Sequence, residues 1–242
     1  MRKISVGVIT IAVVSMAAAF GADMSTQAPP MTPGQTGGGM AITEGSTFEG
    51  DILLKGKITA VFGDVEVRTP GSIVWSKAKR GQIISEGWQI RTGKDGKVQL
   101  RFATNLINLK PNTNLTVSQS TVNTLTGKYT TIFECPEGKA RFEIKDNSRV
   151  AEFKVKTPTA IAGARGTIFF LLVAQNFTEA LVARGTVFLE SLVSGQVQNL
   201  NRGFMSRTTH DGRVSDPQEI PAQYRALMSE GWTPPAGPGP VA

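Results

Sequence analysis

Residues that commonly carry out chemistry are scarce in this chain. It has 242 residues but a single histidine, His210. Hydrolytic triads and most zinc sites need histidine in a rigid pocket, whereas His210 lies in the polar run RTTHDG, which is typical of a surface loop. A phosphate-binding loop is also missing, because Gly163-Ala164-Arg165-Gly166 is followed neither by Lys-Ser/Thr nor by a helical pattern. We therefore predict no metal and no cofactor.

Paired carboxylates could still hydrolyse glycosidic bonds without histidine. They mostly alternate with apolar residues, which is the pattern of water-facing strand positions, and their spacing does not show that any two face each other. We therefore predict that the protein is not an enzyme, and we keep a carboxylate-based hydrolase as an alternative. The candidate acids are Asp64, Glu66, Glu86, Glu143 and Glu152.

An arginine inside an apolar stretch is the most unusual feature of the sequence. Arg165 lies between Gly163 and Gly166 in KTPTAIAGARGTIFFLLV. Glycine permits backbone geometry that other residues avoid, so a corner is expected here. A guanidinium has five donors in a fixed fork, and it can bind several carbonyls or a carboxylate at once. We predict that Arg165 pins this corner; a ligand-contacting or a solvated arginine are the alternatives.

The single cysteine, Cys135, leaves no internal disulfide, so packing alone must hold the fold. We interpret Cys135 as a small apolar core residue beside Phe133. The alternative is a bridge between two chains.

The elements that must position these residues are strands. Short apolar or alternating runs recur about every 8–12 residues and are bounded by glycine, proline or asparagine, which predicts an all-β domain. The run at 168–173 lacks alternation, so we expect it to be covered on both faces. The alternating runs include 65–68, 88–91, 98–102, 115–117, 142–144 and 153–155.

One short helix is predicted near the end of the chain. Pro221 can begin it, Gly231 can end it, and one apolar face is formed by Ile220, Tyr224, Leu227 and Met228. We expect this face to cover an open edge of the sheet; docking on a partner is the alternative.

The two ends of the chain differ in composition from its middle. Arg2 and Lys3 precede an uncharged, largely apolar run, and small residues follow, as in a secretory signal peptide. We predict a signal peptide at 1–21, a flexible Pro/Gly-rich linker at 22–50, the all-β domain at 51–213, a segment with the short helix at 214–232 and a disordered Pro/Gly tail at 233–242. An uncleaved membrane anchor is the alternative for the first segment.

Export predicts a periplasmic, secreted or cell-surface location, with no membrane span after signal cleavage. The formal net charge of +7 is compatible with nucleic-acid binding, but the basic residues are scattered, so we do not expect it.

Several fragments, taken in order, resemble the FecR domain family. The clearest is the phrase Thr157-Pro158-Thr159-Ala160 followed by Arg165-Gly166-Thr167 and an apolar strand. Others lie at 63–67, 81–93, 106–117, 138–142 and 183–187, so the resemblance spans roughly Val61 to Gly203. The residues singled out as its structural motif are Thr157, Pro158, Gly163, Arg165, Gly166 and Thr167.

The resemblance implies an all-β fold of stacked, coil-like strands, a β-solenoid type of arrangement, with a β-sandwich as the alternative. Family members that regulate transcription combine a cytoplasmic anti-sigma segment, a membrane helix and a periplasmic FecR domain. Here a secretory signal comes first, so we expect a stand-alone exported FecR domain. Sigma-factor control and iron citrate sensing are not carried over.

Two functional hypotheses follow. The first is a non-enzymatic binding or sensing module of the bacterial cell envelope, which acts on a protein partner through strand edges and loops. The second is a carbohydrate or peptidoglycan binder that uses Trp75 and Trp88; core packing is the alternative role of these two residues. The identity of the partner and the oligomeric state do not follow from the sequence.

Overall fold

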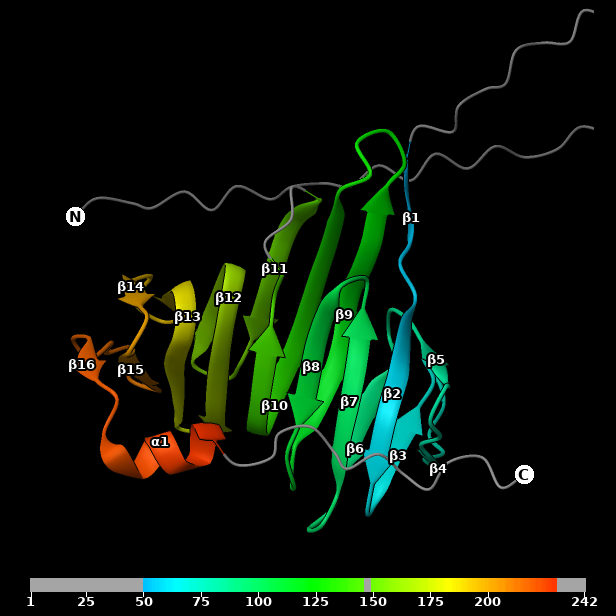
Figure 1. The fold of residues 1–242 in the computed structure, drawn as a ribbon, viewed down its shortest axis with the longest axis horizontal. Coiled ribbons are helices and arrows are strands. Elements are labelled where there is room, and N and C mark those ends of the chain that lie inside the picture. The colour runs from blue at the N-terminus through cyan, green and yellow to red at the C-terminus, as the bar shows by residue number, and fades with distance from the viewer. Residues whose placement is uncertain (1–49, 146–148, 230–242) are drawn as a thin grey trace, which may run out of the picture. The chain divides into compact units, whose positions relative to one another are not determined.

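The computed structural model describes residues 50–145 and 149–229 (Figure 1). The signal peptide expected at 1–21, the linker expected at 22–50 except Gly50, the tail expected at 233–242 and the helix end expected at Gly231 lie outside these residues.

Strands make up most of the described residues, which confirms the all-β prediction. One short helix, α1 (Ala222–Ser229), follows them. The strands are β1 (Asp51–Leu53), β2 (Gly56–Phe62), β3 (Val65–Arg68), β4 (Ser76–Lys77), β5 (Ile83–Ile84), β6 (Gln89–Thr92), β7 (Lys97–Phe102), β8 (Asn105–Leu109), β9 (Asn114–Asn123), β10 (Tyr129–Glu143), β11 (Val150–Lys156), β12 (Ala160–Ala174), β13 (Phe177–Ser191), β14 (Val197–Asn201), β15 (Phe204–Thr209) and β16 (Gln218–Glu219).

Backbone pairing joins these strands into one open sheet. Its main path runs β16-β15-β13-β12-β11-β10-β8-β7-β2-β5, and the remaining strands pair at its sides (Figure 1). Neighbours are antiparallel except for β10 and β11, which are parallel. Within the residues that the structure describes, no helix has the length and apolar content needed to span a membrane.

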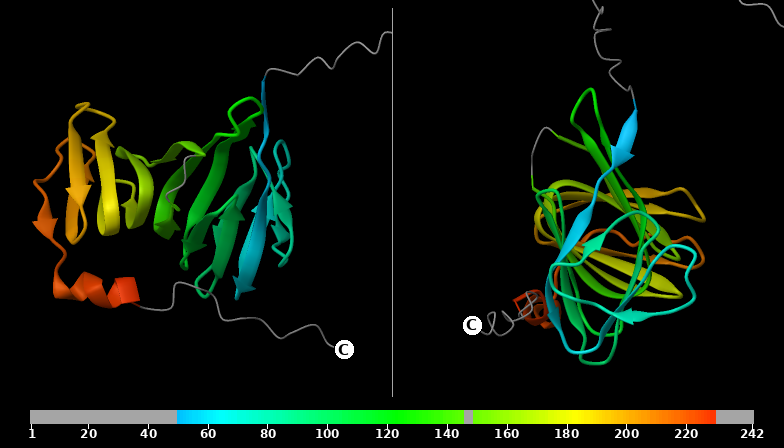
Figure 2. Two further views of the ribbon diagram at one scale, coloured as in Figure 1. Left: turned by 45° about the horizontal axis from the view of Figure 1, so that its top comes forward. Right: turned by 90° about the vertical axis from the view of Figure 1, so that its right-hand side faces the viewer.

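Long strands change neighbours halfway, and this lets the sheet curve around a core (Figure 2). The first half of β10 pairs with β9 and β11, and its second half pairs with β8 and β12. Strands that pass between layers in this way turn at bulges or bends. Five phenylalanine rings from four strands contact one another inside, with centroids 5.0 to 6.4 Å apart: Phe102, Phe133, Phe142, Phe153 and Phe169.

The alternation expected for the strands is confirmed by their burial. In β7, for example, Val98, Leu100 and Phe102 are fully buried while the residues between them face outward. The apolar run at 168–173 lies between two clusters, as predicted. Phe169 belongs to the main core, and Phe170 packs in a second cluster on the opposite face of the strand.

Helix α1 covers that second cluster. Ile220, Tyr224, Leu227 and Met228 pack with side chains of β12, β13 and β15. The apolar face predicted for the helix is therefore confirmed, but it covers a face of the sheet near its end rather than an edge. Strand β16 lies just before it, in a segment for which only a helix was expected.

Two cross-strand pairs place a phenylalanine ring over a glycine. Gly56 is paired with Phe102, and Gly163 is paired with Phe188. A Cβ atom at Gly56 would lie 2.5 Å from the Phe102 ring, and one at Gly163 would lie 1.9 Å from the Phe188 ring. Gly163 is therefore needed because an aromatic ring occupies the space of a side chain.

Cys135 is fully buried in the main core, and its Sγ lies 3.5 Å from the carbonyl oxygen of Glu137. The interpretation of this residue as core packing is therefore confirmed. Burial raises the pKa of the thiol to about 12.

We predict that Gly56→Ala lowers the free energy of unfolding by about 2 kcal/mol, because the Phe102 ring is enclosed by the core and cannot yield. Gly163→Ala is the matched control: the Phe188 ring is only half-buried and can swing toward solvent, so its loss should be smaller. Urea unfolding measures both. An equal or larger loss at Gly163 would contradict the explanation.

We also predict a pH dependence that belongs to Cys135. The thiol is neutral in both states below pH 9, its ordinary pKa being 9.0, but between pH 9 and about 12 it ionises only in the unfolded chain. Its stabilising contribution is therefore complete below pH 9 and is lost above it, by up to about 1.4 kcal/mol per pH unit. Unfolding of the native protein and of Cys135→Ala between pH 8 and 11 should diverge; parallel curves would refute the assignment.

Candidate functional site

The threonines of the Thr157-Pro158-Thr159 phrase face inward, at the turn between β11 and β12. Thr157 Oγ1 donates to the carbonyl of Ala160 at 2.9 Å and accepts from its N–H at 3.0 Å. Thr157 and Thr159 both contact the hydroxyl of Thr178 in β13, at 2.7 and 2.8 Å. Pro158 is exposed at the tip of the turn. The phrase therefore ties one turn to the neighbouring strand and presents little polar surface to a ligand.

Arg165 lies at a bulge inside β12, where the pairing register with β13 shifts between Arg165 and Ile168. Gly166 has φ of 65°, so the corner expected from the glycines is present as a bend within one strand. The clamp expected of Arg165 is wrong, because its side chain is exposed and makes no hydrogen bond or ion pair with any described residue. Thr167 holds the bend instead, because its buried hydroxyl donates to the carbonyls of Arg165 and Thr186, at 2.9 and 3.0 Å.

Strand β13 contains a second glycine bend, which lies opposite the bend of β12. Residues 164–167 and 183–186 both read Ala-Arg-Gly-Thr, and Gly185 has φ of 79°. Arg165 is paired with Thr186, and Arg184 with Ile168. A Cβ at Gly185 would lie 2.8 Å from the carbonyl oxygen of Gly166, so the two bends require each other.

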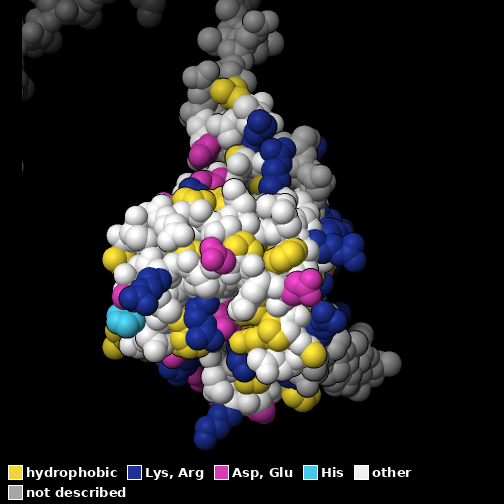
Figure 3. All heavy atoms as spheres, turned by 90° about the vertical axis from the view of Figure 1, so that its left-hand side faces the viewer, with side chains coloured by type: hydrophobic (Ala, Val, Ile, Leu, Met, Phe, Trp, Pro, Cys, Tyr) yellow, Lys and Arg dark blue, Asp and Glu magenta, His cyan; other side chains and the backbone are white. Residues whose placement is uncertain are grey.

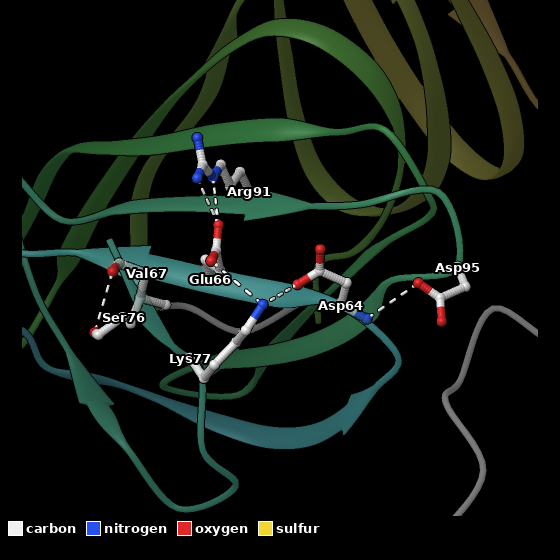
Figure 4. Close-up of polar contacts among 7 residues, drawn as sticks. All are labelled: Asp64, Glu66, Val67, Ser76, Lys77, Arg91 and Asp95. Carbon is white, nitrogen blue, oxygen red and sulfur yellow. Dashed lines mark hydrogen bonds and ion pairs between the residues drawn. The ribbon is translucent and has the colours of Figure 1, made fainter. Parts of the chain in front are cut away.

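Of the five acids proposed from the sequence, the structure brings Asp64 and Glu66 together (Figure 4). Lys77 Nζ lies 2.6 Å from Asp64 Oδ1 and 3.3 Å from Glu66 Oε1, and Arg91 Nη2 lies 2.6 Å from Glu66 Oε2. Asp64 lies in the turn just before β3, and strands β3, β4 and β6 supply the other side chains, because Glu66 is paired with both Lys77 and Arg91 across the ladder.

This ion cluster borders an open polar pocket of about 430 Å³, which Glu137 also lines. The hydrogen bond from Arg91 lowers the pKa of Glu66, and the one to Asp64 raises the pKa of Lys77. Glu66 is therefore a carboxylate held by two cations, whereas a glycosidase needs one carboxyl group that keeps its proton. The arrangement is that of a surface charge network.

The other three acids are separated: Glu86 lies in the turn between β5 and β6, Glu143 in β10 and Glu152 in β11. Glu86 accepts from the N–H of Ser120 at 3.2 Å, Glu143 pairs with Arg141 at 3.0 Å, and Glu152 pairs with Lys154 at 2.5 Å. His210 is exposed, as expected. In the described part of the chain, no group of three or more His, Cys, Asp or Glu side chains is placed to hold a metal ion.

The two tryptophans proposed as sugar platforms differ in their surroundings. Trp88 is partly buried and packs against the main core. Trp75 is half-exposed, and the guanidinium groups of Arg68 and Arg91 lie 4.7 and 4.3 Å from its ring centroid. Cation–π contacts thus use the ring that a sugar would stack on.

Strand β14 forms an open edge of the sheet. Among the described strands, five have one neighbour only, and β14 is the longest of these, with five residues against two or three in β1, β4, β5 and β16. Its sequence, Val-Gln-Asn-Leu-Asn, contains no charge and no proline, the residues that usually block pairing at an edge.

Exposed apolar side chains surround this edge. The space-filling view of this end of the sheet shows hydrophobic side chains among cations and acids (Figure 3). The exposed members are Leu192, Val193, Val197 and Phe204. They come from the β13–β14 turn, from β14 itself and from the start of β15, so they flank the free edge.

Sequence reasoning missed Glu179, the one buried acid of the described residues. It lies in β13 with a relative exposure of 2 %. Arg207 of β15 donates to it through Nε at 2.9 Å, and the Tyr224 hydroxyl of α1 donates to Oε2 at 3.0 Å. The hydrogen bond to Glu179 raises the pKa of Arg207. The pKa of Tyr224 is also raised, mainly by burial and to a smaller extent by its hydrogen bond to Glu179. Glu179 therefore fastens the helix to the sheet.

The chain is thus an all-β sheet with paired glycine bends, which follow a turn whose two threonines are buried. Residues 89–188 match the family model described as FecR protein, so the resemblance seen in the sequence is confirmed over this range, from β6 into β13. The fragment at 63–67 and the first part of the fragment at 81–93 lie outside the match, as does the end of the resemblance from 189 to Gly203.

Two crystal structures of an anti-sigma factor candidate from Parabacteroides distasonis ATCC 8503, at 2.50 and 1.65 Å resolution, are similar to this chain. Each is 18% identical, with a TM-score of 0.47 over 59% of this chain. The chain spans 64% and 65% of their lengths. No curated protein matches the chain.

We predict that Arg207→Met lowers the free energy of unfolding by about 2 kcal/mol, because it leaves a buried carboxylate with only the Tyr224 hydroxyl; the half-exposed arginine keeps the loss below that of a fully buried pair. Arg213→Met is the matched control, since its pair with Asp211 is exposed and should change stability by less than about 0.5 kcal/mol. Thermal unfolding compares the two, and equal effects would argue against the role of Glu179.

Proposed function

We propose that this protein is an exported, non-enzymatic FecR-domain protein that serves as a binding or sensing module of the bacterial cell envelope and acts through contacts with a protein partner. The family match at 89–188 supports a regulatory type of domain. The basic, then apolar, then small-residue pattern of the first 21 residues supports export to the periplasm or cell surface.

The observation that carries the proposal is the free edge of β14. An extended segment of a partner can add to such an edge by backbone hydrogen bonds, which supply affinity, while side chains beside the edge supply specificity. Here Val193 and Val197 offer apolar contacts to alternate side chains of the added strand. When the added strand buries both valines, the apolar surface beside β14 is no longer exposed to water.

The paired bends make this edge possible. The first half of β13 pairs with β15, and its second half pairs with β14. Strand β15 is in turn covered by β16 and by a bridge to Val214, whereas β14 has no second neighbour among the described residues. A partner would therefore extend the sheet beside β14 without displacing any strand.

We predict that Val197→Lys combined with Asn199→Lys abolishes partner binding, because charge on an edge strand opposes the addition of another strand. Both positions are exposed, so the fold should be kept. The measurement is affinity capture from envelope extracts, with circular dichroism to check the fold. Leu125→Lys, an equally exposed apolar residue in the β9–β10 turn, is the control.

A protein retained by the native chain and by Leu125→Lys, but lost with the β14 double variant, is the expected result. Equal capture by all three would overturn edge pairing. Saturable sedimentation with purified cell wall and no captured protein would replace the proposal with a carbohydrate-binding function.

A further inference from the structure

The loop between β3 and β4 presents two aliphatic side chains to solvent. Ile73 is 87% exposed and Val74 is 68% exposed, more than any other large hydrophobic residue that the structure describes. They lie next to each other, at the opposite end of the sheet from β14. Neither the FecR match, which begins at residue 89, nor the edge proposal uses this loop.

Local contacts hold the loop in a defined shape. Ser72 Oγ accepts a hydrogen bond from the Val74 N–H at 3.0 Å, and Ser76 Oγ donates to the Val67 carbonyl at 3.3 Å. The Trp75 ring is fixed against Arg68 and Arg91. The apolar tip, which we define as Ile73 and Val74, is therefore exposed by the fold itself.

The chain around the tip is basic. Residues 67–85 include four cations, Arg68, Lys77, Lys79 and Arg80, and no acid. Asp64 and Glu66, the acids beside this segment, are already paired with Lys77 and Arg91. Arg68 ends β3 beside the loop; its guanidinium lies over the Trp75 ring and forms no ion pair with a described residue, so its charge remains available near the tip. Lys79 and Arg80 are exposed and likewise form no such pair, but they follow β4, at the end of the hairpin away from the loop.

A protruding aliphatic pair beside a tryptophan and an arginine whose charge is available has the chemistry of a bilayer interface. Anionic headgroups attract lysine and arginine, and the acyl boundary accepts aliphatic side chains, with tryptophan favoured at the headgroup level. A second copy of this chain would bring an equally positive tip, and like charges oppose that contact. We propose that the apolar tip inserts into the interface of an anionic phospholipid bilayer, with Arg68 beside the headgroup phosphates and with Lys79 and Arg80 adding longer-range attraction to the anionic surface.

Vesicle sedimentation of the full chain tests this proposal. Native protein should bind vesicles of phosphatidylcholine with phosphatidylglycerol at least about tenfold more tightly than vesicles of phosphatidylcholine alone, and salt should weaken the binding. Ile73→Asp with Val74→Asp should abolish the preference for anionic vesicles. Leu125→Asp with Ile52→Asp adds the same charge at two other exposed apolar positions and should bind as the native protein does.

A second readout locates the contact. Trp88→Phe with Trp232→Phe leaves Trp75 as the only tryptophan, and its fluorescence should be quenched by lipids with brominated acyl chains. Because the quenching reports on Trp75 itself, it distinguishes contact by the tip from vesicle binding through the apolar run near the N-terminus. Absence of quenching, or equal binding by the tip variant and the control, would overturn the proposal. The proposal would also be overturned if the tip variant lost self-association, or lost capture of an acidic protein, while its vesicle binding stayed unchanged. Because β14 lies elsewhere, the edge variant tests the other proposal separately.

Discussion

Gly166 and Gly185 touch across the β12–β13 hairpin, and both adopt a left-handed backbone that favours glycine. Each strand bends where the other bends, so the ladder continues on both sides of the bulge. The bend lets one part of β13 meet β15 and the other part meet β14. The C-terminal end of the sheet, with its docked helix and its free edge, depends on this single local arrangement.

The interior around the bends is partly polar, and threonine hydroxyl groups supply hydrogen-bond partners there. Thr157, Thr159 and Thr178 bond to one another, and Thr167 holds two carbonyls at the bulge. A buried polar group without a partner destabilises a fold, so such groups constrain which chain path is acceptable. The threonines of the family motif therefore lie inside, whereas the surfaces proposed for binding lie at the two ends of the sheet.

Much of the fold could be predicted from the sequence because alternation reports burial directly. The strand at 98–102 and the doubly covered run at 168–173 follow from that pattern. The lengths of β10 and β12 could not be predicted, since glycine and proline within them resemble turn signals although the strands continue past them. A bulge also shifts the alternation by one residue, which is why Arg165 faces solvent instead of clamping the bend.

The surfaces proposed for binding were less accessible to sequence analysis. An edge is defined by strands that do not pair, and β14 reads like any short strand. Glu179 looked ordinary because its partners lie 28 and 45 residues further along the chain. Only three-dimensional pairing brings such groups together.

The short turn of the β12–β13 hairpin also limits the chain entropy that is lost when this region folds. Ala174 pairs with Phe177, so only two residues close a ladder that extends to Ala160 and Ser191. The chain entropy lost on loop closure rises with loop length, and it is small for so short a connection. Contact between the two bends thus comes from neighbouring segments, and assembly of this region requires little search through distant parts of the polypeptide.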